Sequence, residues 1–145
     1  MAVGIQAKVR RAILTALKAE TSLTDLVAAA RILPQGAGGE PAWPFVRLGA
    51  AITQPSKAAC TAGGDVAMDV HAFARARSSG GQVVETAEDH AGRIGAAIET
   101  ALADNRLALE GGSIAHISLS DLTLMADEEP ESFHWFAQIN ARVLA

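Results

Sequence analysis

The stretch from residue 63 to residue 102 constrains the fold of this chain more than any other. Every second side chain of residues 65–74 is apolar, which predicts a strand with one face buried against a core (Val66, Met68, Val70 and Ala72). Residues 78–81, Ser-Ser-Gly-Gly, predict a sharp reversal because glycine tolerates positive φ. Over residues 83–102, starting at Val83, apolar residues recur at helical spacing. A long amphipathic helix is therefore expected to cover the strand.

The remainder of the chain predicts two further helices and a series of strands. The helices are expected over residues 5–19 and 23–30, and Ser22 with Asp25 three residues later resembles a capping box. The alternation of residues 114–126 changes phase at Ser120 and Asp121, which predicts a bulge or a strand that joins a second packing surface. Strands are expected over residues 31–33, 45–49, 107–109, 114–126 and 132–144. Whether the second of these strands continues to residue 53 is left open.

These elements predict one domain, residues 1–145, of the α+β class. The sheet is expected to be mostly antiparallel, with the helices packed on one face. The last two strands are expected to form a long hairpin whose outer arm extends past the body of the domain.

Composition excludes several classes of protein. A net charge of −4 and a pI near 5.5 argue against a nucleic-acid surface that needs many phosphate contacts. The chain has one cysteine, Cys60, which excludes an internal disulfide and a cysteine-based zinc cluster and fits a reducing compartment. No run of about 18 apolar residues is present, and no signal peptide is expected, so the sequence predicts a protein without a membrane span.

Residue chemistry gives little support to an enzyme. Asp69 and His71 share a strand face, where a carboxylate could orient an imidazole base, but no GxSxG serine elbow accompanies them. The glycines at residues 36–39 lack the Lys-Ser/Thr pair of a phosphate-binding loop. The four histidines lack zinc-site spacing, and the carboxylates at 127–131 do not match a calcium loop. The sequence therefore predicts no catalytic residue, no cofactor and no metal.

Other features point to surfaces for contact with other molecules. Trp43 lies in the Pro-rich loop of residues 34–44, either as a lid over the edge of the core or as an interface anchor. Leu122, Leu124 and Phe136 are expected to lie outside the core, on the outer hairpin arm. Interface candidates are therefore Trp43, Leu122, Leu124 and Phe136, together with the carboxylates Asp127, Glu128 and Glu129 at the tip of the hairpin.

The order of short motifs along the chain carries a resemblance to a known family. An Ala-rich first helix and a short second helix lead into RILPQG at 31–36 and PFVRLG at 44–49. DVHAF at 69–73, a Gly-Gly pair, an Ala-rich helix and a closing hairpin with HWFAQI at 134–139 follow. This pattern resembles the small tail-completion proteins of long-tailed phages and of phage-derived gene transfer agents, within the tail terminator group.

The resemblance implies a virion structural protein with a tail-terminator-like fold. Such a subunit assembles with copies of itself into a ring, usually a hexamer, that caps the tail tube and ends its growth. The ring would contact the tail tube protein on one side and the head connector or stopper on the other. It would lie at the tail–neck junction after assembly in the bacterial cytoplasm, and DNA would pass through its bore without specific binding.

Two other functions remain open on the sequence. The first is a head–tail connector or stopper protein of the neck, which would bind on the portal side. The second is a small enzyme or ligand-binding domain that uses the face carrying Asp69 and His71.

Overall fold

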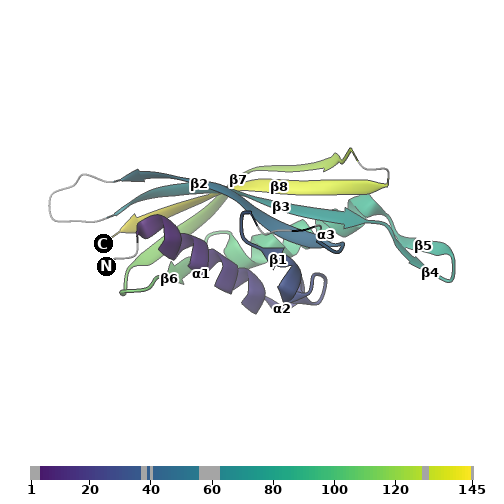
Figure 1. Ribbon diagram of the computed structural model, residues 1–145, viewed down its shortest axis with the longest axis horizontal. Helices are drawn as coiled ribbons and strands as arrows, with labels where there is room; N and C mark the ends of the chain where they lie inside the picture. Colours follow the sequence, from purple (N-terminus) through teal and green to yellow (C-terminus); the bar gives the residue numbers. More distant parts are fainter. Residues whose placement is uncertain (1–3, 37–38, 40, 56–62, 129–130, 145) are drawn as a thin grey trace.

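The computed structural model describes residues 4–36, 39, 41–55, 63–128 and 131–144. Three helices of the α type and one 3₁₀ turn are interspersed with eight strands in this part of the chain (Figure 1). The elements, in chain order, are α1 (Ile5–Ala19), α2 (Thr21–Thr24), the 3₁₀ turn η1 (Ala29–Arg31), β1 (Ile32–Leu33), β2 (Phe45–Pro55), β3 (Gly64–Arg75), β4 (Arg77–Ser79), β5 (Gln82–Glu85), α3 (Ala87–Leu102), β6 (Arg106–Ala108), β7 (Ile114–Ala126) and β8 (Ser132–Leu144).

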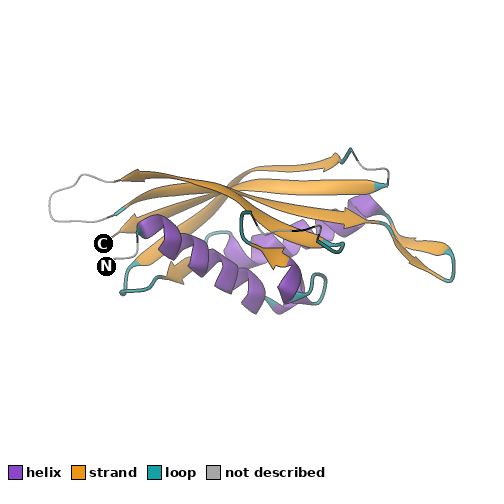
Figure 2. Ribbon diagram, in the orientation of Figure 1, coloured by secondary structure: helices purple, strands orange, loops and turns teal. Residues whose placement is uncertain are grey.

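The predicted α+β fold with a mostly antiparallel sheet is confirmed. Six strands form one sheet in the order β1-β2-β3-β8-β7-β6, in which β1 runs parallel to β2 and the other neighbours are antiparallel. The helices α1 and α3 lie against one face of this sheet (Figure 2). The opposite face, here called the outer face, carries no helix of the described chain.

Alternation along the strands explains why the helices cover that one face. The predicted apolar side of β3 is buried, and the same holds for the β8 side chains paired with it. On α3 the apolar stripe meets this inner face and includes Ile94 and Ile98, both without exposed surface. Burial of a continuous apolar layer between helix and sheet is the main stabilising contribution to such a fold.

The start of α3 differs from the prediction. Val83 belongs to strand β5 and is 61% exposed, so it is not part of the helical stripe. Gly80 and Gly81 both have positive φ and form the two-residue loop of a β-hairpin, β4–β5. The helix begins only at Ala87, where the hydroxyl of Thr86 accepts a hydrogen bond from the Asp89 amide at 3.2 Å.

The second predicted helix, residues 23–30, is also wrong in its bounds. The chain instead makes the single turn α2 and then the 3₁₀ turn η1. Ser22 does not cap a helix, because it lies inside α2 and its hydroxyl donates to the Glu20 carboxylate at 3.0 Å. Ending α2 early lets the chain bury both Leu23 and Val27, which have no exposed surface.

The predicted irregularity in β7 is confirmed as a bulge. Ser120 pairs with Gln138, whereas Thr123 pairs with Phe136, so β7 has one more residue than β8 over this interval. Asp121, inside the bulge, has a φ of 55°. Because of the extra residue, the odd-numbered side chains of β7 face the helices before the bulge, as Ala115 does, and the even-numbered ones face them after it, as Leu124 does.

Candidate interaction surface

The β4–β5 hairpin projects from one end of the molecule, beyond the end of β3 (Figure 1). Val83 and Val84 are 61% and 57% exposed. Ser78 pairs with Val83 and Arg77 with Glu85, so Val84 is the extra residue of a bulge, and the hairpin presents both valines to solvent. Sequence reasoning missed this hairpin, although a Gly-Gly pair between two short strands is a recognised hairpin signal.

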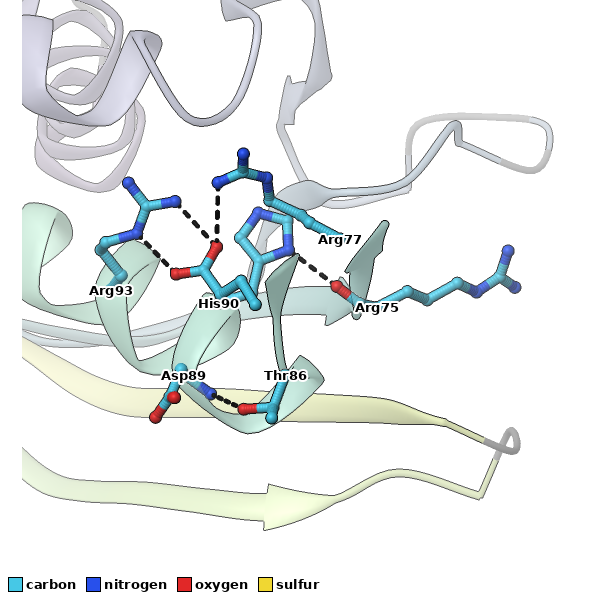
Figure 3. Close-up of polar contacts among 7 residues, drawn as sticks. Arg75, Arg77, Thr86, Asp89, His90 and Arg93 are labelled. Carbon is cyan, nitrogen blue, oxygen red and sulfur yellow. Dashed lines mark hydrogen bonds and ion pairs between the residues drawn. The ribbon is translucent and has the colours of Figure 1, made fainter. Parts of the chain in front are cut away.

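Ion pairs fix the base of the hairpin to α3. Figure 3 shows Arg77 and Arg93 directed at one carboxylate, that of Glu85 in β5. Arg93 donates to the two Glu85 oxygens at 2.9 and 2.8 Å, and Arg77 donates at 3.2 Å. The pKa of Glu85 is lowered, mainly by the hydrogen bonds that it accepts from Arg93. This carboxylate therefore stays ionised at neutral pH.

A buried histidine fixes the end of β3, just before the hairpin begins. His90 on α3 is 5% exposed, and its Nδ1 lies 2.8 Å from the carbonyl oxygen of Arg75 (Figure 3). A carbonyl oxygen only accepts, so Nδ1 carries the proton and donates. The chain is thereby held where β3 ends and the hairpin begins, and the hairpin leaves the body in a defined direction.

An aromatic cluster lies on the outer face of the sheet. The ring of Trp43 makes edge contacts with Phe45 and Phe73 at centroid distances of 5.3 and 6.0 Å. The guanidinium of Arg75 lies 4.2 Å from the Trp43 centroid, which is a cation–π geometry. Trp43 is half-buried and covers this outer cluster rather than the edge of the main core.

A histidine pair continues the cluster. His71 Nδ1 and His134 Nε2 are 2.8 Å apart, so one ring is the donor and the other the acceptor. The partner of His71 Nδ1 is therefore His134, and not the Asp69 carboxylate that the sequence suggested as an orienting group. Within the described residues, no group of three or more His, Cys, Asp and Glu side chains is arranged to hold a metal ion.

The histidine pair predicts a stability that depends on pH. Burial lowers the pKa of both His71 and His134, and each of them is below 6.5 in the folded state. The unfolded chain then binds more protons, so the free energy of unfolding should be highest above pH 6.5 and decrease as the pH falls below it. Urea unfolding between pH 8 and pH 5.5 measures this. The variant His71→Gln/His134→Gln should lose most of the decrease, and an equal decrease in both proteins would refute the assignment.

The predicted interface residues of the β7–β8 hairpin do not form one patch. Leu122 and Leu124 are 45% and 39% exposed, and Leu124 lies on the helix side of the sheet, next to Gly92 of α3. Phe136 is half-buried on the outer face, with its ring 5.9 Å from that of His71. Of the carboxylates at the turn, Asp127 is half-buried and Glu128 is exposed, whereas Glu129 lies outside the described residues.

A trough of about 850 Å³ crosses the other half of the outer face. It runs over β2, β3, β8 and β7 to the start of β6. Sequence reasoning did not find it because none of these strands contributes more than four of its lining residues. Its lining includes Ile52, which is 68% exposed, and the amides of Gln138 and Asn140. The trough is therefore an open depression lined by both polar and apolar surface, with an exposed isoleucine on β2.

The chain was compared with known proteins. A family model described as tail completion protein gp17 matches residues 11–144. A chain in a solved structure of the virion of a native gene transfer agent particle has a similar fold, with a TM-score of 0.76 and 18% sequence identity. The alignment covers 99% of this chain and 100% of that chain. No curated protein matches. Among the described residues, no helix is both long enough and apolar enough to cross a bilayer.

Proposed function

The chain belongs to the tail completion protein family, and we propose that copies of it form a ring, a hexamer, that caps the tail tube, stops its growth and joins it to the head connector. The resemblance to tail-completion proteins is confirmed by the match over residues 11–144, and the protein is a structural component of a phage-type tail. The finer role, with the ring and its two neighbours, is the proposal.

The observation that carries the proposal is the distribution of exposed apolar side chains. Eight large hydrophobic residues are exposed in the described chain. In the half of the sheet near the β7–β8 turn and the β4–β5 hairpin lie Val83, Val84, Leu122, Leu124 and Met125; in the other half lie Ile52, Ile114 and Leu144. A closed ring repeats one contact between two different surfaces of the subunit, so exposed apolar side chains near two separated ends of the molecule fit a ring better than a two-fold dimer.

Charge supports passage of DNA through such a ring. The chain has a net charge of −4, and a ring of acidic subunits repels DNA rather than binding it. We propose that residues 1–145 act as one domain in this ring, at the tail–neck junction, after assembly in the bacterial cytoplasm. We further propose Trp43, Phe136 and the carboxylates at the β7–β8 turn as contacts to the tail tube protein or the connector.

The alternative proposal is a head–tail connector or stopper of the neck. It places the same subunit on the portal side of the junction, and the same two groups of exposed apolar side chains support it. An enzyme is the weakest candidate, because the family is one of structural virion proteins and the ring nitrogen of His71 is hydrogen-bonded to His134.

Deleting the gene tests the proposal. Without a terminator, tube subunits continue to add, so we expect tails of abnormal and variable length in electron micrographs of lysates. Expression of the wild-type gene from a plasmid should restore the normal length. Tails of normal length that remain detached from DNA-leaking heads would instead support the stopper and contradict the terminator.

A further inference from the structure

We propose that the β4–β5 hairpin of one copy lies in the outer-face trough of the next copy around the ring. The proposal rests on the ring of the proposed function and adds the two surfaces that meet at each contact. The occupant of the trough is therefore a second copy of this chain.

The hairpin has the features of an element that is completed by a partner. A two-stranded ribbon is only marginally stable in water when nothing packs on it. Here Val83 and Val84 are both more than half exposed, so the hairpin carries apolar side chains that nothing in the same chain covers. Its base is nevertheless fixed by the contacts of Glu85 and His90 described above. Such preorganisation reduces the entropy lost on binding, which favours insertion into a partner.

The same chain cannot place its hairpin in its own trough. The hairpin follows the end of β3 at Arg75, whereas the trough lies over the start of β3, at Asp65. Ten residues of strand separate the two points, a distance of about 33 Å at 3.3 Å per residue. A contact between hairpin and trough therefore joins different copies and uses two different surfaces, as a ring requires.

The trough matches the hairpin in charge and in hydrogen-bonding groups. Its charged side chains balance, with Asp65 and Asp104 against Arg106 and Arg142, and Arg142 donates to Asp65 at 3.1 Å. The hairpin tip, residues 78–82, is the uncharged sequence Ser-Ser-Gly-Gly-Gln. An uncharged tip can enter without leaving an unpaired charge buried, which would be costly.

The polar groups of the trough are already ordered, and apolar contact is available beside them. Gln138 Nε2 donates to Asn140 Oδ1 at 3.0 Å, and Asn140 Nδ2 donates to Ser120 Oγ at 3.0 Å. The remaining amide positions can pair with the serine hydroxyls and free backbone groups of a hairpin tip. Ile52 at the side of the trough provides the apolar partner for one of the hairpin valines.

Disulfide cross-linking tests the contact. In a Cys60→Ser background, the full chain carrying Ile52→Cys and Val84→Cys is assembled into particles in the host and mildly oxidised. We expect a ladder of covalent multimers on a non-reducing gel, up to the copy number of the ring, that collapses on reduction. Each single-cysteine chain should stay monomeric, as should Val84→Cys combined with Ala96→Cys, because Ala96 is an exposed position on α3 away from the trough.

The outcomes separate this inference from the ring itself. Rings detected by native mass or imaging without a ladder overturn the hairpin contact and leave the ring intact. A band that links Val84→Cys to a different virion protein also overturns it. A chain that is monomeric in solution and in particles overturns the ring and this contact together.

A charge substitution supplies a second test that does not depend on cysteine chemistry. Val84→Asp should weaken self-association at least tenfold in sedimentation or mass photometry, whereas Ala96→Asp should not change it. Both positions are exposed, so both chains should fold as the wild type does. Equal assembly of the two variants would overturn the proposal.

Discussion

Replacing Gly95 with alanine should lower the free energy of unfolding by about 2 kcal/mol, although alanine is the better helix former. Gly95 lies in the middle of α3, where an added Cβ would overlap the indole ring of Trp135. Trp135 is 6% exposed on the inner face of β8, so its ring has little room to move. Either the helix or the strand must shift, and packing around both is lost. Urea unfolding of the two proteins measures the difference.

Gly92 provides a matched control one turn earlier on the same helix. A Cβ there would meet only Leu124 Cδ2 at 3.6 Å, an ordinary contact. Gly92→Ala should therefore stabilise the protein, by up to about 1 kcal/mol of helix propensity. Adding Trp135→Leu to Gly95→Ala should recover part of the loss in a double-mutant cycle. Equal effects of the two glycine substitutions would show that the helix does not approach Trp135 as closely as the structure indicates.

The part of the fold that could be predicted depends on short-range patterns. The apolar face of β3 and the bulge of β7 are visible because alternation along one strand records which side is buried. The close approach of Gly95 to Trp135 is not visible, since it joins residues 40 positions apart in the sequence. The projecting hairpin was missed for a different reason: Val83 continues the helical spacing of α3, so one local pattern concealed another.

The candidate surface was predicted less well than the fold. Leu124 and Phe136 were assigned to the same hairpin arm, but the bulge and the alternation of β8 place them on opposite sides of the sheet. The trough depends on the pairing of β2, β3, β8 and β7, and no single segment contains enough of its lining to indicate it. Long-range pairing, rather than any local motif, creates the surfaces that we propose for assembly.

A pair of identical substitutions separates the residues that stabilise the fold from those expected to act in the ring. Ile98→Ala, at a fully buried position on α3, should lower the free energy of unfolding by about 2–5 kcal/mol because it leaves a cavity between helix and sheet. Ile52→Ala, at a position 68% exposed on the outer face, should change it by less than about 0.5 kcal/mol. Both values come from urea unfolding at a concentration at which the chain is monomeric.

The concentration dependence of unfolding then distinguishes the two isoleucines further. If the outer face of one copy receives the hairpin of the next, assembly stabilises the folded wild type, and its unfolding midpoint rises with protein concentration. Ile52→Ala should reduce this rise, whereas Ile98→Ala should lower the midpoint at every concentration. A large loss of monomer stability in Ile52→Ala would mean that this side chain belongs to the core, and the trough would then lack the apolar contact proposed for a hairpin valine of the neighbouring copy.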